Sequence, residues 1–202
     1  MSIEAPKKLM QKLSLIIPTN SHRRLLLRRT LKHLSESNFM GEIIIADHSP
    51  CEHGVCEIVM SEFQGDLSLR YRQQSPNLHF LERIVDAANI LSSEFVMMHA
   101  DDDFALVHGL EACVTHLLDN SQSVLCQGRM AHIKLQFEAV NPEIIPSRYS
   151  RRARIEENPL IRLIMLLQNY CASLYAVHRR ECFLEALAHT LRYSRDLTYW
   201  QY

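Results

Sequence analysis

The stretch Phe95-Val96-Met97-Met98-His99-Ala100-Asp101-Asp102-Asp103 is an apolar run that ends in three consecutive carboxylates. The apolar run is typical of a buried strand, whereas unpaired carboxylates are costly to remove from water. We therefore expect the acids at the open end of the strand, where water, a metal ion or a cationic partner reaches them. Side chains alternate along a strand, so Asp101 and Asp103 are expected on one face and Asp102 on the other.

This pair of carboxylates suggests a metal site. Carboxylate oxygens are ligands that Mg²⁺ and Mn²⁺ prefer, and such an ion can carry a substrate diphosphate. Asp101 and Asp103 are therefore candidate metal ligands. The alternative for three acids taken alone is a solvated acidic turn, and the surrounding sequence has to decide between the two interpretations.

Two further segments are typical of buried parallel strands, because each is a short apolar run that ends in polar or turn-forming residues. They are Leu13-Ser-Leu-Ile-Ile-Pro-Thr-Asn20 and Glu42-Ile-Ile-Ile-Ala-Asp47, and another strand is expected over residues 67–72. Apolar residues at helical spacing predict helices over residues 23–37, 52–63, 78–91 and 106–118. Strands that alternate with helices of this length indicate an α/β fold with a mostly parallel sheet.

The carboxyl ends of these strands are expected to form a binding edge. Ligands of open α/β sheets bind beyond the carboxyl ends of the strands. Thr19 and Asn20, Asp47 and the three acids all follow such strand ends. Three unrelated solvated turns have no reason to converge on one edge, so this arrangement favours a binding site over a solvated turn.

The remainder of the chain has a weaker pattern. It predicts one longer strand or a bent pair over residues 123–134, a lid loop over 136–154, a helix over 158–167, a final strand over 171–178 and a closing helix over 181–191. The last residues stop without a capping or breaking signal, so we expect the chain to be a truncated piece of a longer protein.

The composition excludes several classes of function. The 202 residues suffice for one domain with a substantial core, and 22 basic against 23 acidic residues create no field that would attract nucleic acid or an anionic membrane. No apolar stretch approaches the ~20 residues that span a bilayer. With 5 glycines, the chain has neither a Gly-rich phosphate loop nor the dinucleotide fingerprint.

The 6 cysteines are scattered and follow no secretory leader, so we expect free thiols in a reducing cytoplasm. His48, Cys51, His53 and Cys56 fall within nine residues and raise the alternative of a zinc site. Their spacing matches none of the paired-knuckle patterns. Incidental cysteines in a polar loop are the preferred explanation.

Three segments in register resemble family 2 glycosyltransferases of the GT-A fold. The members of this family have a first strand that ends in Pro-Thr/Ala-Tyr-Asn, a second that ends in Asp-Asp-Gly-Ser and a later one that ends in the DXD metal motif. The matching segments here end at Asn20, at Ser49 and at Asp103, and the order and spacing agree over residues 13–135. Residues 173–181 are similar to an acceptor-side strand of a bacterial subgroup.

The resemblance implies a Rossmann-like sandwich with a mostly parallel central sheet flanked by helices. It divides the chain into an N-terminal extension (1–12), a nucleotide-sugar-binding half (13–135), and a lid loop with an acceptor-side half (136–202). The implied activity is that of a metal-dependent hexosyltransferase, which moves a sugar with inversion from a nucleotide-diphosphate donor to a hydroxyl acceptor. The implied cofactor is Mn²⁺ or Mg²⁺, the preferred donor is a UDP-sugar, and the acceptor is a glycan or another hydroxyl compound.

The resemblance also assigns roles to individual residues. Pro18, Thr19 and Asn20 would line the nucleoside pocket. Asp47 would hold the base or the ribose, although an Asp that caps the following turn explains it equally well. Asp101 and Asp102 would contact the nucleotide sugar, and Asp101 and Asp103 would bind the metal.

The sequence departs from the family pattern at three places. No Tyr precedes Asn20, and His48 replaces the second Asp of the second motif. An alignment without a shift places His99 at the first Asp of the usual Asp-X-Asp-Asp, which leaves Asp101 with Asp102 as an alternative ligand pair.

An inverting transferase needs a carboxylate base to deprotonate the acceptor hydroxyl. The family takes this base from a late segment beside an aromatic residue, which points to Asp196 ahead of Tyr199 and Trp200. Glu181 and Glu185 are alternatives, and each is also explained as a solvated helix residue. His178, Arg179 and Arg180 are further candidates for the metal sphere or the diphosphate, and a structural role explains them as well.

Two other functions compete with the transferase. One is a non-catalytic GT-A-like module that binds a nucleotide sugar or a glycan, which the altered second motif and the abrupt end favour. The other is a nucleotidyltransferase or two-metal phosphoryl enzyme that uses the same acids. Such an enzyme normally has a Gly-, Arg- or Lys-rich phosphate motif near the first strand, where this chain has only His22-Arg23-Arg24.

Overall fold

The computed structural model describes residues 6–50, 59, 61–134, 143–146, 155–168 and 172–194. Its strands are β1 (Leu13–Thr19), β2 (Glu42–Asp47), β3 (Ser68–Gln73), β4 (Phe95–Met98), β5 (Leu125–Cys126), β6 (Ala131–Lys134), β7 (Glu143–Pro146) and β8 (Val177–Arg179). Its α-helices are α1 (Pro6–Met10), α2 (Arg24–Glu36), α4 (Phe80–Ala88), α5 (Val107–Asp119), α6 (Pro159–Gln168) and α7 (Arg180–Ser194), with short 3-10 helices η1 (Ser21–Arg23) and η3 (Ser173–Tyr175).

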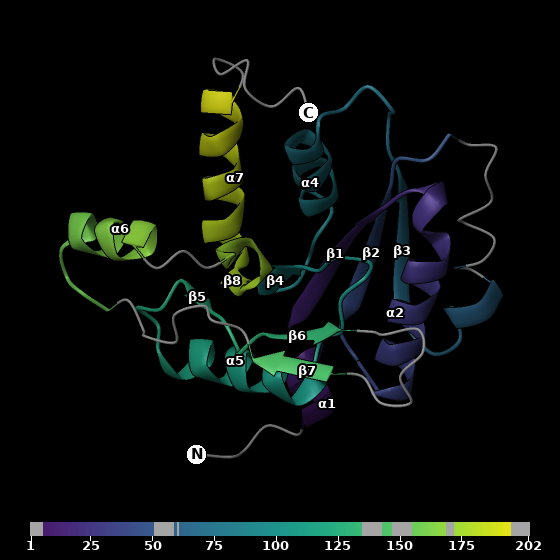
Figure 1. The fold of residues 1–202 in the computed structure, drawn as a ribbon, viewed down its shortest axis with the longest axis horizontal. Coiled ribbons are helices and arrows are strands. Elements are labelled where there is room, and N and C mark those ends of the chain that lie inside the picture. The colour runs from purple at the N-terminus through teal and green to yellow at the C-terminus, as the bar shows by residue number, and fades with distance from the viewer. Residues whose placement is uncertain are drawn as a thin grey trace. The chain divides into compact units, whose positions relative to one another are not determined.

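The chain forms two compact units, residues 1–126 with 174–202 and residues 127–173. The first unit contains a six-stranded sheet in the order β3-β2-β1-β4-β8-β5 (Figure 1). The four strands from β3 to β4 are parallel to one another, and β8 is antiparallel to both β4 and β5. The predicted mostly parallel α/β sheet is confirmed. The chain leaves the first unit after Cys126 and returns at Leu174, and the predicted division at residue 135 stays a prediction.

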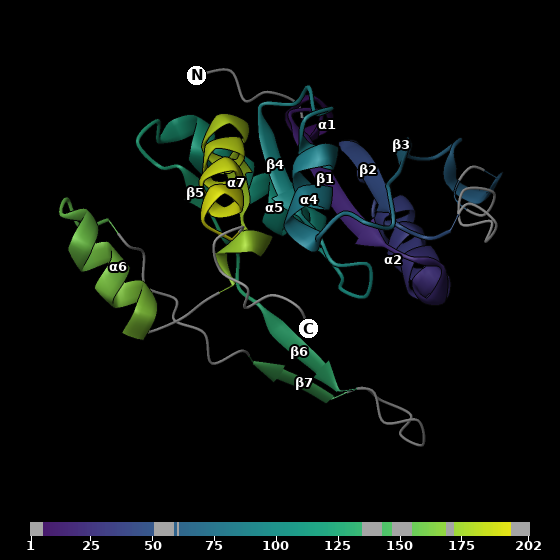
Figure 2. The ribbon, with the colours of Figure 1, turned by 90° about the horizontal axis from the view of Figure 1, so that it is seen from above.

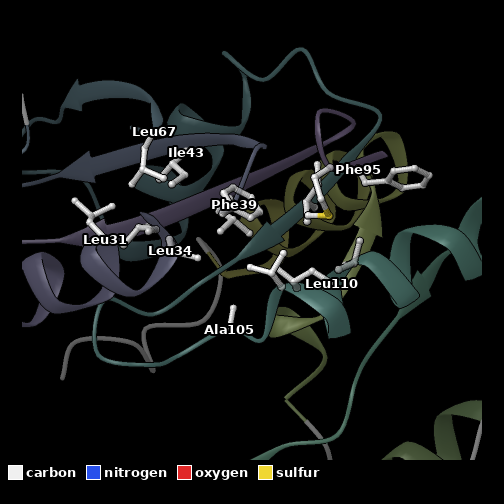
Figure 3. Packing of buried hydrophobic residues seen from close by; sticks show 14 of the residues in the cluster. Leu31, Leu34, Phe39, Ile43, Leu67, Phe95, Ala105 and Leu110 are labelled. Atoms are coloured by element: carbon white, nitrogen blue, oxygen red, sulfur yellow. The ribbon is translucent and has the colours of Figure 1, made fainter. Parts of the chain in front are cut away.

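Both faces of the central strands are buried. Leu15 and Ile17 of β1 belong to a core with α2 and α5, whereas Ile16 belongs to a second core with α4 and α7. Figure 3 shows the first core, in which side chains from α2, β2, β4 and α5 meet. When both faces of a strand are buried, apolar residues do not alternate with polar ones along it. This explains the nearly continuous apolar run in β1.

The structure corrects three sequence predictions. The stretch 123–134 is neither one strand nor a bent pair, because β5 joins the large sheet and β6 pairs antiparallel with β7 (Figure 2). The predicted lid loop contains strand β7, and its other residues lie outside the described part of the chain. The segment predicted as the last strand forms η3 before the short β8.

A paired charge connects α4 to the edge strand β3. Two nitrogens of Arg72 lie 2.8 and 2.6 Å from the two carboxylate oxygens of Asp86, and these hydrogen bonds hold the pKa of Asp86 below its ordinary value. A carboxyl whose folded-state pKa is lowered adds stability above its unfolded-state pKa, and this stability is lost as the pH falls through the folded-state value.

We therefore expect wild type to be more stable than Asp86→Asn near neutral pH, with a difference that disappears below the ordinary pKa of 3.8. The Arg72 side chain is 46% exposed, so the difference is expected to stay below about 1 kcal/mol. Thermal unfolding of both proteins from about pH 6 to about pH 2.5 measures it. A difference that is constant over this range contradicts the assignment.

Candidate functional site

The carboxyl ends of β1, β2 and β4 meet at one edge of the sheet, as the sequence predicts. Thr19 is in register with Asp47 across the β1–β2 pair. On the other side of β1, the backbone N–H of His99 donates to the carbonyl of Ile16 over 2.8 Å. The polar residues that follow the three strands therefore lie at the same edge.

The three acids do not continue strand β4. The strand ends at Met98, and Asp101 and Asp102 lie in a turn. Asp101 is buried with 2% of its surface exposed, whereas Asp102 and Asp103 are exposed. The predicted alternation of Asp101 and Asp103 on one strand face is therefore wrong, because the extended backbone on which it depends ends before the first acid.

A guanidinium from the start of α2 bridges two of the acids. The Arg23 Nε atom lies 2.7 Å from Asp101 Oδ1 and 3.0 Å from its Oδ2, and the Nη2 atom lies 2.7 Å from Asp101 Oδ1 and from Asp102 Oδ2. These hydrogen bonds, first to Asp101 and then to Asp102, raise the pKa of Arg23 above its ordinary value. The guanidinium therefore carries its charge at neutral pH.

Helix α2 also holds the backbone of the acidic turn. The fully buried Thr30 hydroxyl lies 2.8 Å from the carbonyl oxygen of Asp101 and 3.2 Å from that of Asp103. Arg29 donates from Nη2 to the carbonyl of Asp102 over 3.0 Å. Because the turn is fixed from one rigid helix, the orientation of the acids depends on α2 as much as on β4.

The residues after β1 continue this cluster. Thr19 donates its hydroxyl proton to Asp101 Oδ2 over 2.9 Å, and both side chains are buried. Pro18 is half-buried and pairs with Ala46 in the sheet. The side-chain oxygen of Asn20 accepts from the backbone N–H of His22 over 3.0 Å and caps η1. Thr19 thus supports the acid directly, and Asn20 shapes the turn into the helix.

Asp47 forms a second, separate cluster at the same edge. It is 1% exposed, and its Oδ1 accepts from the backbone N–H of Ser49 over 2.8 Å and from the Ser49 hydroxyl. The Tyr71 hydroxyl lies 2.7 Å from Asp47 Oδ2. Both carboxylate oxygens are therefore engaged by protein donors, and the bond to the Ser49 backbone is the turn cap that the sequence left as an alternative.

His99 lies between β4 and the acids and is buried. Burial lowers its pKa below the ordinary value of 6.5, so the ring is neutral near pH 7. Its Nδ1 lies 2.6 Å from the carbonyl oxygen of Ala100, which can only accept, so Nδ1 carries the proton. This hydrogen bond fixes the ring against the backbone just before the acidic turn.

The candidates from the late part of the chain lie elsewhere. Strand β8 is antiparallel to β4, which pairs Arg179 with Phe95 at the amino end of β4, the edge opposite to the acids. Arg179 donates to the carbonyls of Ser123 and Leu117, and Arg180 to that of Leu91. Both arginines therefore connect elements of the fold at the far edge, and the expectation that they contact a diphosphate beside the acids is wrong.

The other late candidates lie on β8, on α7 or outside the described residues. Glu181 and Glu185 are exposed on α7, and the ring of His178 lies 5.1 Å from that of Phe183. Asp196, the predicted base, lies outside the described residues, as do Cys51, His53 and Cys56 of the alternative zinc site.

The predicted metal ligands do not fit a metal ion in this arrangement. Both oxygens of Asp101 are engaged by Arg23 and Thr19, so the carboxylate has no free oxygen directed to a cation. Asp103 is exposed and could serve only as one ligand. Within the described ranges, no group of three or more His, Cys, Asp or Glu side chains is arranged to hold a metal.

Sequence reasoning missed two parts of the site. The sequence pattern singles out Arg23 only as part of His22-Arg23-Arg24, although its position four residues after β1 places it beside the strand end. Tyr71 alternates with exposed residues along β3 and reaches Asp47 across the strand pair. A search for polar residues on the strands next to each strand end would have found Tyr71.

Comparison with known proteins relates this fold to glycosyltransferases. No family model and no curated protein matches the chain in sequence. Among solved structures, S. aureus TarS matches with a TM-score of 0.57 and 19% identity over 84% of this chain and 28% of TarS. The S. aureus TarS 1–349 complex with UDP-GlcNAc matches with a TM-score of 0.55 and 18% identity over 84% of this chain and 45% of that chain.

A third match is a mannosyltransferase. The mannosyltransferase PcManGT from Pyrobaculum calidifontis, in complex with GDP-Man and Mn²⁺, has a TM-score of 0.50 and 19% identity over 58% of this chain and 36% of its own. The chain thus spans less than half the length of each of these structures. None of the helices in the described part is both long and apolar enough to cross a membrane. With its mostly parallel sheet between two helical layers and these structural neighbours, the chain has the GT-A fold of glycosyltransferases.

Proposed function

We propose that the chain is the nucleotide-sugar-binding part of a glycosyltransferase. The observation that carries this proposal is the convergence of Thr19, Asp47 and the acidic turn at the carboxyl edge of a sheet with the GT-A fold. This edge is where open α/β sheets bind their ligands. The structural neighbours support the choice of donor, because they are complexes with UDP-GlcNAc, UDP and GDP-Man.

The proposed reaction is transfer with inversion to a hydroxyl acceptor, such as a glycan. The acceptor oxygen forms a bond to the anomeric carbon, the bond from that carbon to the diphosphate oxygen breaks, and the nucleoside diphosphate leaves. The acceptor proton goes to a carboxylate, for which we propose Asp196. Pro18, Thr19, Asn20, Asp47, Asp101 and Asp102 are proposed to shape the donor pocket.

A divalent ion, Mn²⁺ or Mg²⁺ at Asp101 and Asp103, belongs to the proposal. When bound, such an ion neutralises the charge of the departing nucleotide. In this chain Asp101 has to part from Arg23 before it can serve as a ligand. Asp103 is exposed at the same turn and needs no such rearrangement.

Calorimetric titration of UDP, GDP and CDP, with Mn²⁺ and with EDTA, tests the proposal. We expect one nucleotide to bind in the presence of Mn²⁺ and Asp103→Ala to weaken its binding by about tenfold or more, which corresponds to about 1.4 kcal/mol. Asp119→Ala is the matched control, because Asp119 is an exposed acid at the opposite end of α5. Failure of all three nucleotides to bind with metal present contradicts the proposal.

The second candidate is a module that binds a nucleotide sugar without turnover. The altered second motif favours it, because His48 stands after Asp47 where the family has a second Asp. Hydrolysis of UDP-GlcNAc and GDP-Man with Mn²⁺ separates the two functions. Slow release of nucleoside diphosphate supports the transferase, and binding without any release supports the module.

A further inference from the structure

Helix α6 presents an apolar face to solvent. Leu160, Leu163, Ile164 and Leu167 follow one another at the spacing i, i+3, i+4 and i+7, which places them on one side of a helix. Each of these four side chains is exposed, by between 44% and 73%. We call this surface the α6 face. It is a continuous apolar stripe, because neighbours at these spacings contact one another along a helix.

A stripe of this kind normally covers a core, as another helix of the same chain shows. Leu27, Leu31 and Leu34 of α2 are spaced i, i+4 and i+7, and each is at most 1% exposed. In the unit of residues 127–173, by contrast, none of the side chains whose burial the structure describes is buried. A large exposed apolar patch is a mark of an interaction surface. The α6 face is therefore a candidate for contact with a partner.

The charge of this unit indicates what kind of partner it is. In the sequence, residues 127–173 contain seven Lys and Arg residues against four Glu and no Asp, whereas the remainder of the chain contains 15 basic and 19 acidic residues. The balanced total thus combines a basic unit with an acidic one. An apolar helical face within a basic segment is typical of a helix that lies on an anionic membrane surface.

The helix is suited to lie on a membrane rather than to cross it. Its ten residues extend over about 15 Å, half of the ~30 Å hydrocarbon layer. Its one charged residue, Arg162, follows Leu160 by two positions, which is about 200° around the helix axis. The Arg162 guanidinium donates to the carbonyl oxygens of Glu156 and Glu157 ahead of the helix. The α6 face itself therefore carries no charge.

We propose that α6 docks the protein on the surface of an anionic lipid bilayer. The α6 face enters the boundary between headgroups and acyl chains, where its leucine and isoleucine side chains leave water. The basic residues of the same unit attract the anionic headgroups. This inference goes beyond the proposed function and does not depend on a donor site at the carboxyl edge of the sheet.

Vesicle flotation tests the docking. We expect the protein to bind vesicles of phosphatidylcholine with roughly one third phosphatidylglycerol, and to bind pure phosphatidylcholine vesicles at least about tenfold more weakly. Leu160→Gln/Leu167→Gln is expected to weaken binding to the anionic vesicles about tenfold or more, because two apolar side chains are lost without a change of charge. Leu25→Gln/Leu106→Gln is the matched control, since these leucines are 71% and 73% exposed outside the α6 unit. It is expected to bind like wild type.

Four results would overturn the proposal. The first is that anionic vesicles fail to bind the wild-type protein, and the second is equal binding to both kinds of vesicle. The third is an equal loss of binding in the two double variants, because the effect would then reflect surface hydrophobicity alone. The fourth is a dimer in sedimentation velocity that Leu160→Gln/Leu167→Gln dissociates, because a second copy of the chain would then cover the α6 face.

Circular dichroism and thermal unfolding show whether the variants fold. Side chains that contact no core can be replaced without loss of the fold, so both double variants are expected to unfold within a few degrees of wild type. If Leu160→Gln/Leu167→Gln alone fails to fold, the α6 face is covered within the protein and the proposal is wrong. The comparison of the two kinds of vesicle uses the wild-type protein and does not depend on any variant.

The outcome is separate from the test of the proposed function. Binding to anionic vesicles without binding of any nucleotide would retain the docking helix and reject the donor site. Nucleotide binding by a protein that ignores anionic vesicles would retain the donor site and reject the docking helix.

Discussion

Gly41→Ala is expected to lower the free energy of unfolding by about 2 to 3 kcal/mol. A Cβ atom at Gly41 would overlap the carbonyl oxygen of Leu13 and lie 2.5 Å from the Phe39 ring and 2.9 Å from the Met10 carbonyl. Two of these three atoms belong to the backbone at the entry to β1. Because β1 lies in the interior of the sheet with fully buried side chains, its backbone cannot move away cheaply.

Urea denaturation of Gly41→Ala beside Gly109→Ala measures this effect. Gly109 is in the first turn of α5, where a Cβ would meet only the Leu106 side chain at 3.9 Å. Ala there is expected to raise stability by about 0.5 kcal/mol through helix propensity. If Gly41→Ala is as stable as wild type, the close approach of Gly41 to the start of β1 is wrong.

Asp101→Ala is expected to lower the free energy of unfolding by about 2 to 4 kcal/mol, although it removes one of three adjacent acids. The substitution leaves the Thr19 hydroxyl without its acceptor and takes from Arg23 its principal partner. The estimate stays below that for a fully buried ion pair because Arg23 is 38% exposed and water can solvate part of it.

Asp103→Ala is the matched control in the same turn. Its side chain is exposed and makes no hydrogen bond or ion pair within the described residues, so the expected change is within about 0.5 kcal/mol. Thermal and urea unfolding of both variants give the comparison. Equal destabilisation by the two substitutions would contradict the buried position of Asp101.

Strands β1, β2 and β4 were predictable because each is built on a short, nearly continuous apolar run, which is typical of a buried strand. The predicted segment 42–47 is β2 itself, and the run from Leu13 contains all of β1. The convergence of Thr19, Asp47 and the acids also followed from the sequence, since parallel strands place their carboxyl ends at one edge.

The weaker elements were not predictable in the same way. Strand β8 has three residues and pairs antiparallel with β4 at Phe95 and Val96. Its direction depends on where the chain returns from residues 127–173, and no local pattern encodes that return. Arg179 was a candidate for the metal sphere or the diphosphate, with a structural role as the alternative, and the antiparallel pairing places it in that structural role at the amino end of β4.

The sequence by itself determined the α/β class, the central strands and the edge at which the polar residues gather. It did so because hydrophobic periodicity can be read within a short segment, and because strands that alternate with helices form a parallel sheet. Only the tertiary structure decided which of three identical acids is buried and which cation meets it. That choice depends on Arg23 and Thr30 of another segment, more than seventy residues away along the chain, and a pattern of neighbouring residues carries no information about such a contact.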